Sequence, residues 1–318
     1  MTPDQITYIV FGILLIIALA FDLGLLSKKH AHVTIKKALW QTVFWVSLAL
    51  GFFIFLWFRN GQNIALQYVS AYLLEWSLSI DNIFVFILIF TFFGIKADFV
   101  PRVLLIGILM AIIFRIIFIT IGVVIVERYE WVLYIFGAIL LFTGYKMFTA
   151  SSNEIVDLEK NKVYAIMKRF LPLTTSNEHG GKITIKLEGK KYYTSIFVVI
   201  VLLATTDIVF ALDSIPAVFA ISQERLVIYT SNIFAVLGLR SLYFLLQGAV
   251  NKFAYLQQGI AIVLVFIGLK MLVVYFNIHV PVYISLLVIL VSIAASIVYS
   301  ISVANREKGD DDSIEPIT

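Results

Sequence analysis

The sequence contains no cysteine, so disulfide bonds and thiolate metal ligands are excluded for this chain. Its 4 histidines, at positions 30, 32, 179 and 279, fall in predicted loops or at the ends of apolar segments. Charged residues make up only 14% of the 318 positions, against about 25% in a typical soluble domain. No nucleophile–base set or nucleotide-binding loop appears either. These absences argue against a soluble enzyme and against a buried histidine or cysteine metal centre.

Apolar residues are abundant, at 61% of the chain, and the mean hydropathy is +0.98. Apolar runs of about 20 residues recur, each long enough to cross a bilayer of roughly 30 Å as a helix. Because backbone polar groups in lipid must bond internally, helices are expected rather than open sheets. The sequence therefore predicts an all-α polytopic membrane protein of about nine transmembrane helices, near residues 6–26, 38–58, 66–93, 101–126, 131–149, 194–222, 226–249, 255–276 and 280–303.

Basic residues gather on one side of these predicted spans. They follow the odd-numbered spans, at Lys28, Lys29, Lys36, Lys37, Lys96, Arg102, Lys252, Arg306 and Lys308 and in the 160–191 region, whereas the other side has only Arg59, Arg128, Arg225 and Lys270. Cytoplasmic loops carry the excess of lysine and arginine. We therefore expect the N-terminus outside and the C-terminus in the cytoplasm. The same loop bias explains the net charge of +4, so no nucleic-acid partner is predicted.

Long-range similarity within the chain indicates an internal repeat. Asp81 follows Glu75, and Asp213 follows Asp207, at the same spacing; further on, Arg115 matches Arg240, and "LLFTGYKM" (140–147) matches "LVFIGLKM" (264–271). Each copy contains three spans, and an odd number inverts the second copy relative to the first. Inverted repeats of this kind are typical of transporters whose substrate site lies near the membrane midplane.

The repeat divides the chain into six predicted segments. Two flanking helices occupy 1–65, the first repeat 66–149 and the inverted second repeat 194–276, with a last helix at 277–304. Between the repeats, the cytoplasmic connector 150–193 contains a short amphipathic segment, "VYAIMKRFLP", and an alternating pattern typical of a β-hairpin that turns at Glu188 and Gly189. The polar tail 305–318 is expected to be disordered.

Four carboxylates lie inside the apolar spans, at Glu75, Asp81, Asp207 and Asp213. One carboxylate at the bilayer centre costs roughly 3 kcal/mol or more, so such residues usually have a function. Six residues of helix advance about 9 Å and turn about 240°, which places the two acids of one helix on different faces. They could converge through a helix break, which Pro216 favours, or through pairing across the repeat. We favour cross-repeat pairing with local unwinding.

Arg115 and Arg240 are the bases deep within the predicted spans. Together with the four acids they leave a formal charge of −2, which one divalent cation or two protons would neutralise. This balance favours metal–proton exchange, and a closed set of structural ion pairs is the alternative. Possible additional oxygen ligands, or residues that support the site, are Asn82, Thr205, Thr206, Ser214 and Asn232; for Asn232, a helix–helix hydrogen bond is an equal alternative. Such a hard oxygen site suits Mg²⁺, Ca²⁺ or Mn²⁺.

Four long motifs resemble the TerC family, and within it the Alx type: "EWSLSIDNIFVF", "TDIVFALDSIPAVFA", "TSNIFAVLGLRSLYFLL" and "YIFGAILLFTGYKM". The resemblance extends from the first predicted span to the last. It implies a nine-span protein of the bacterial inner membrane, in the LysE-like transporter group, with manganese export as the leading activity. Members are also linked by name to tellurium resistance. The family's acidic residues correspond to Glu75, Asp81, Asp207 and Asp213, whereas Ala204 replaces a further acid that Alx-like relatives often carry.

Residues and resemblance together predict a proton-coupled Mn²⁺ exporter. The four acids would be ligands and proton acceptors, while Arg115 and Arg240 would pair with carboxylates once the metal has left. The alternative is a non-transporting accessory protein of the membrane that delivers metal to secreted proteins or acts in a redox or tellurium stress response. Its partner would then be the secretion machinery.

Overall fold

The computed structural model describes residues 3–26, 34–129, 131–149, 162–173, 182–187, 190–247, 255–276, 278 and 280–311. Within the helices, the side chains of some residues lie outside this description, among them those of Asp81 and Asp213. The long helices are α1 (Pro3–Leu26), α2 (Ile35–Arg59), α3 (Gln62–Phe92), α4 (Val100–Arg128), α5 (Val132–Thr149), α7 (Ser195–Ile221), α8 (Arg225–Leu237), α9 (Leu239–Leu246), α10 (Leu256–Val273) and α11 (Val282–Asp311).

Local sequence signals account for several helix ends. The Thr34 hydroxyl accepts a hydrogen bond from the Lys37 backbone N–H (3.3 Å) and so caps α2. Gly61 separates α2 from α3 with φ of 93°, a conformation that glycine adopts without steric cost. Pro101 lies in the first turn of α4, where its missing N–H removes no helical hydrogen bond. These signals direct the chain into antiparallel neighbours connected by short turns.

The structure is a bundle of apolar helices, as expected of a multi-pass membrane protein. In the described residues, six helices are long and apolar enough to cross a membrane, or seven if α8 and α9 form one bent span. The apolar stretches in α1 and α5, Gln5–Ile17 and Val132–Phe148, are shorter. The predicted helical fold class is therefore confirmed, while the count of nine spans stays a prediction.

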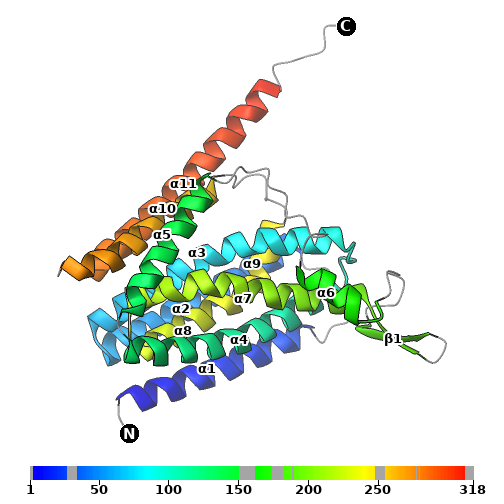
Figure 1. The fold of residues 1–318 in the computed structure, drawn as a ribbon, viewed down its shortest axis with the longest axis horizontal. Helices are drawn as coiled ribbons and strands as arrows, with labels where there is room; N and C mark the ends of the chain where they lie inside the picture. Colours follow the sequence, from blue (N-terminus) through cyan, green and yellow to red (C-terminus); the bar gives the residue numbers. More distant parts are fainter. Residues whose placement is uncertain are drawn as a thin grey trace.

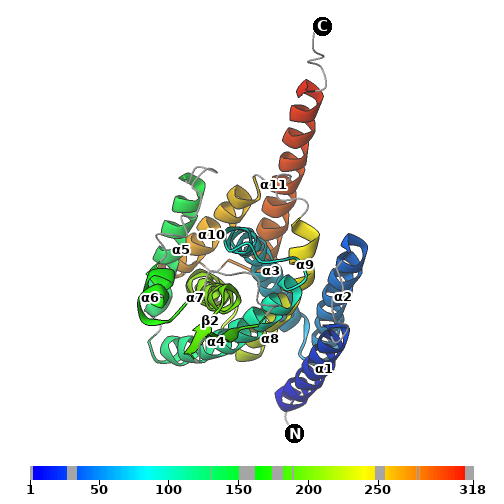
Figure 2. The same cartoon turned by 90° about the vertical axis from the view of Figure 1, so that its right-hand side faces the viewer.

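The centre of the bundle is formed by α3, α4, α7 and α8 (Figures 1 and 2). In α3, 69% of the apolar window is buried, compared with 28% in α2 and 17% in α11, which lie at the periphery. Helices α1 and α2 lie on one side of the bundle, and α5 and α10 pair on another (Figure 2). Among the long apolar helices, α3 and α7, which contain the predicted functional acids, have the largest buried shares, 69% and 50%.

Contacts along the helices define their relative directions. From α4 to α7, Gly107 meets Leu203, Arg115 meets Asp207 and Gly122 meets Phe219, so these two helices are parallel. Helices α3 and α8–α9 are also parallel, with ring contacts from Tyr68 to Phe234 (6.3 Å) and from Phe90 to Tyr243 (5.5 Å). By contrast, α5 and α10 are antiparallel, because Gly137 meets Gly268 whereas Gly144 meets Ala261.

The connector contains helix α6 (Lys162–Phe170) and the strands β1 (Thr184–Leu187) and β2 (Lys190–Tyr193), which pair antiparallel. Thr194 anchors the hairpin to the start of α7, since its hydroxyl donates to the Lys182 carbonyl (2.7 Å). We call the end of the bundle with α6, β1 and β2 the connector face; α4 and α7 begin there (Figure 1). The opposite end, with the α2–α3 and α7–α8 turns, is called the far face.

One prediction about helix continuity is wrong. The unwinding expected near Pro216 is absent, because α7 is continuous from Ser195 to Ile221; the neighbouring helices of the bundle let a membrane helix tolerate proline. Instead, the predicted span 226–249 is bent by 40° between α8 and α9, at Gly238. Glycine lacks the side chain that stabilises a helix against bending, and kinks commonly occur there. The break lies next to Arg240, not next to an acid.

The last helix extends into the polar C-terminal segment. Helix α11 continues to Asp311, into the segment 305–318 expected to be disordered. The stretch "NREK" that follows Ala304 contains strong helix formers, and no glycine or proline interrupts it before Gly309. Residues 312–318 lie outside the described part of the chain.

Candidate functional site

Arg115 lies at the centre of the bundle, in the middle of α4, with only 1% of its surface exposed. Its Nε donates to Asp207 Oδ2 (2.9 Å) and its Nη2 donates to Asp207 Oδ1 (3.0 Å). These two parallel bonds join α4 to α7 in the bidentate geometry that a planar guanidinium and a carboxylate favour. The predicted first repeat is thereby joined to the predicted second repeat.

The third nitrogen of Arg115 contacts the two remaining central helices. Its Nη1 pairs with Glu75 Oε1 of α3 and donates to Asn232 Oδ1 of α8 (3.0 Å). Asn232 in turn donates from Nδ2 to the Ile228 carbonyl (3.2 Å), which fixes the orientation of its amide. One guanidinium therefore organises side chains from α3, α7 and α8. We call Glu75, Arg115, Asp207 and Asn232 the central cluster.

The central cluster is buried and carries excess negative charge. Glu75 and Asn232 are 0% exposed and Asp207 is 1% exposed, so none of the charges is solvated. Two carboxylates and one guanidinium leave a formal charge of −1. Moreover, Glu75 Oε2 is buried and accepts no hydrogen bond from the described part of the chain. A buried carboxylate oxygen without a donor is costly, and it is a suitable ligand for a cation.

Two serine hydroxyls near the central cluster also lack a hydrogen-bond partner among the described residues. These are Ser79 Oγ and Ser214 Oγ, both buried. Ser79 follows Glu75 by four positions and Ser214 follows Asp207 by seven, so each shares a helix face with its acid. Most neighbouring hydroxyls behave differently: Ser77 donates to the Leu73 carbonyl (2.6 Å), and Thr206 to the Leu202 carbonyl (2.7 Å).

For the remaining predicted site residues, the structure gives burial or the position in a helix. Asn82 is buried in α3 (3% exposed), and Arg240 is buried in α9 (6% exposed). Asp81 and Asp213 belong to α3 and α7, but their side chains lie outside the described part of the structure. Among the side chains that are described, no three carboxylates or histidines converge as metal ligands. Convergence of all four acids thus stays a prediction, whereas Glu75, Asp207, Arg115 and Asn232 do come together.

Comparison with known proteins agrees with this architecture. The family model described as "Integral membrane protein TerC family" matches residues 60–308. The chain belongs to the TerC family. It is 41% identical over 298 residues to "Uncharacterized membrane protein STKORF319" of Myxococcus xanthus, with 94% of this chain and 92% of that protein covered. It is 40% identical over 286 residues to "Putative membrane-bound redox modulator Alx" of Escherichia coli K12, with 87% and 88% covered.

A third relative of this TerC-family protein is an "Uncharacterized membrane protein" of Rickettsia felis, 38% identical over 295 residues, with 93% of this chain and 97% of the relative covered. No solved structure matches the chain. The resemblance read from the four sequence motifs is therefore confirmed at the level of the family, and the match includes every residue of the central cluster.

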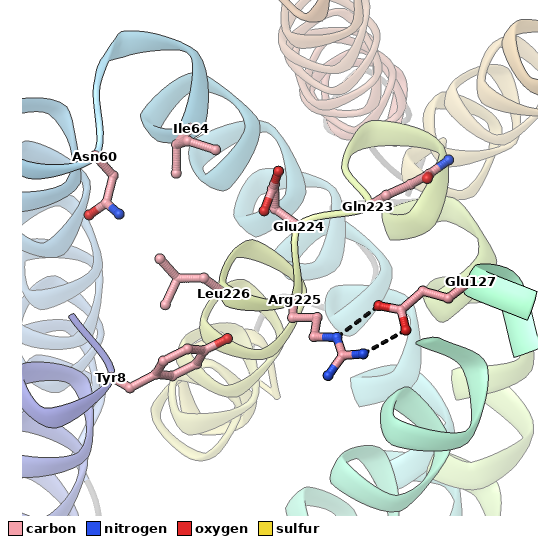
Figure 3. Close-up of a pocket in the computed structure, with 8 residues that line it drawn as sticks. All are labelled: Tyr8, Asn60, Ile64, Glu127, Gln223, Glu224, Arg225 and Leu226. Carbon is pink, nitrogen blue, oxygen red and sulfur yellow. Dashed lines mark hydrogen bonds and ion pairs between the residues drawn. The ribbon is translucent and has the colours of Figure 1, made fainter. Parts of the chain in front are cut away.

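The TerC-family fold also has an exposed pocket of about 500 Å³ at the far face (Figure 3). Tyr8, Asn60 and Glu224 line it, and at one edge Arg225 Nε donates to Glu127 Oε1 (2.8 Å). These two charged side chains are 58% and 51% exposed, and ion pairs this exposed contribute little to stability. The pocket is thus a surface feature, distinct from the buried central cluster.

Proposed function

We propose that this protein exports a hard divalent cation, Mn²⁺ foremost, through a site between α3 and α7. The central cluster carries the proposal: it holds a buried built-in cation, Arg115, between carboxylates from both helices, and leaves Glu75 Oε2 without a donor. Carboxylate oxygens that already bind the Arg115 guanidinium are also suitable ligands for a divalent cation. Oxygen donors alone suit Mn²⁺, Ca²⁺ and Mg²⁺, and the family resemblance favours Mn²⁺.

In this mechanism Arg115 and the cargo compete for the same carboxylates. With the cargo absent, the guanidinium neutralises Asp207 and Glu75 and keeps the helices together. When the cation arrives, the carboxylates, with Asp81 and Asp213 as the other proposed ligands, bind it instead. Protons would replace the cation on the return step, which couples export to a proton gradient. Ser79 and Ser214, with Asn82 and Thr206, would supply neutral oxygen, and Arg240 would act for the second repeat as Arg115 acts for the first.

Alternating access through an inverted repeat is the proposed transport cycle, and reciprocal packing supports it. Adding 124 to a residue number turns Gly144 into Gly268 and Gly137 into position 261. Two of the glycine contacts between α5 and α10, Gly144 with Ala261 and Gly268 with Gly137, are therefore exchanged by this operation. The parallel pairs α4–α7 and α3–α8 exchange in the same way. Transporters built from such repeats move one unit against the other.

The alternative function is that of an accessory protein without transport activity, which delivers metal to secreted proteins through the secretion machinery or modulates redox or tellurium stress. The name of the Escherichia coli relative favours this alternative. Because the chain contains no cysteine, it has no thiol couple of its own, and for this alternative we propose that a redox effect acts through metal supply. In either case we propose the bacterial inner membrane, with the N-terminus outside and the connector and C-terminus in the cytoplasm.

The test of transport uses purified protein in liposomes that enclose a manganese-sensitive dye. We expect Mn²⁺ influx that depends on a pH gradient, and we expect Asp207→Asn to lower it to the protein-free background, because asparagine supplies no charge for the cation. Glu127→Gln is the matched control, since it removes an exposed carboxylate far from the central cluster. Full flux in Asp207→Asn would refute the site, and absence of flux with the native chain would favour the accessory role.

A further inference from the structure

Two glycines of α4 each accommodate a large side chain of α7, one on either side of the Arg115–Asp207 pair. A Cβ at Gly107 would lie 3.2 Å from Leu203 Cβ and Cδ1, and a Cβ at Gly122 would lie 3.0 Å from Phe219 Cε2. Because α4 and α7 both begin at the connector face, Leu203 lies toward that face and Phe219 toward the far face. Two apolar contacts therefore enclose the buried charges: the connector-side contact (Gly107–Leu203) and the far-side contact (Gly122–Phe219).

A small cavity lies at the connector-side contact. Its volume is about 10 Å³, and Asp207, Gly107, Leu203 and Leu239 are among its lining residues. A space of this size is close to the minimum for one water molecule. Asp207 is the charged member of an otherwise apolar lining. The cavity thus reaches the Asp207 carboxylate from the connector side, but it is too small for a hydrated ion.

Exposed polar contacts link α4 and α8 in the far half of the bundle. Thr120 Oγ1 and Tyr229 Oη share a hydrogen bond (2.7 Å), and Arg225 Nε donates to Glu127 Oε1 (2.8 Å). On the connector side, Leu203 packs against Gly107 and is only 2% exposed. An apolar constriction blocks ions by excluding water, and it opens when a side chain moves aside. The connector-side contact is therefore an apolar constriction that rotation of one side chain would open.

We infer that Leu203 is the side chain that closes the path from the connector face to Asp207, and that Gly107 is the socket that receives it. Water, protons and the divalent cation would reach the carboxylate when Leu203 leaves this socket. The identity of the cargo rests on the proposed function, but the access of water to the cavity does not.

The chain has no cysteine, so a single introduced thiol can report access to the cavity. Ala111 lines the cavity and is 4% exposed, which makes Ala111→Cys a suitable reporter; Ile108→Cys, also in the lining, is a second reporter. Full-length protein in sealed vesicles is treated at the connector face with a membrane-impermeant thiol reagent. We expect slow labelling of the reporter alone and labelling several-fold faster when Leu203→Ala is added.

Phe219→Ala is the matched control, because it truncates the side chain that makes the far-side contact, which lies on the same helix as Leu203. It should leave labelling from the connector face at the rate of the reporter alone. Two results would overturn the inference. One is an equal labelling rate for the reporter alone, the reporter with Leu203→Ala and the reporter with Phe219→Ala, at both reporter positions. The other is an acceleration of labelling by Phe219→Ala equal to that by Leu203→Ala. Labelling does not depend on manganese: faster labelling in a protein that moves no Mn²⁺ supports the gate and refutes only the cargo, whereas unchanged labelling with normal flux refutes only the gate.

Discussion

At the scale of single residues, the shape of the guanidinium explains how one side chain joins four helices. Two of the three nitrogens of Arg115 fit the Asp207 carboxylate, and Nη1 is left for Glu75 and Asn232. A lysine ammonium is a point donor and cannot make this planar set of contacts. Removing one partner of a buried ion pair typically costs about 3–5 kcal/mol, because the other charge stays buried. In the proposed mechanism, Arg115 therefore leaves the carboxylates only when another cation replaces it.

The unpartnered serines give a specific prediction about affinity. Replacing Ser79 by alanine removes a neutral oxygen near Glu75, and we expect the apparent affinity for Mn²⁺ to fall by about threefold to tenfold, the effect of losing one polar contact. The measurement is the Mn²⁺ concentration that gives half-maximal flux in liposomes. Ser77→Ala is the control, since the Ser77 hydroxyl bonds to its own helix. Equal affinities in the two variants would exclude Ser79 as a ligand.

The sequence singled out the residues of the central cluster, although not this grouping, because charges in apolar spans are improbable. Glu75, Asp207 and Arg115 were conspicuous for this reason, and Asn232 was identified by its place in the repeat. Ser79 and Leu203 could not be identified in this way, because serine and leucine are ordinary in membrane helices and only burial and contacts distinguish them. For Ser79, the four-residue spacing from Glu75 was a signal that sequence reasoning missed.

At the scale of helices, close packing of α5 and α10 depends on glycine. A Cβ at Gly144 would lie 2.8 Å from Val265 Cγ2, and a Cβ at Gly268 would lie 2.8 Å from the Gly137 carbonyl oxygen. In lipid the hydrophobic effect does not drive helices together, and small residues instead allow the close van der Waals packing that does. The continuity of α7 and the bend at Gly238 show the limit of the sequence approach. Proline predicts a break in an isolated helix, whereas the packing of the bundle decides where the bend occurs.

This packing predicts equal effects of two substitutions in different repeats. Gly144→Ala and Gly268→Ala should each destabilise the protein by roughly 1–3 kcal/mol, because the added methyl group has no space. Thermal unfolding in detergent measures the change. Gly51→Ala is the control, since a Cβ there meets nothing within 4 Å, and it should preserve or raise the unfolding midpoint. A loss at only one of the two repeat glycines would contradict the reciprocal packing on which the inverted repeat rests.

At the scale of the whole molecule, composition sufficed to predict a helical membrane protein, and long motifs sufficed to predict the TerC family. The arrangement of the helices could not be derived in the same way, since apolar residues face both lipid and protein and periodicity does not separate the two. The structure supplies that arrangement, in which the helices that contain the acids are central and α1, α2 and α11 are peripheral. A buried cluster with net negative charge between α3, α4, α7 and α8 is the result.

The most direct test of this account is the position of manganese in crystals of the protein soaked with Mn²⁺, measured by anomalous scattering at the manganese edge. We predict a peak between α3 and α7, within bonding distance of carboxylate oxygens of Glu75 and Asp207, with Arg115 displaced from at least one of them. A peak only at the surface, or none while Arg115 still bridges both carboxylates at saturating Mn²⁺, would contradict the proposed cation site.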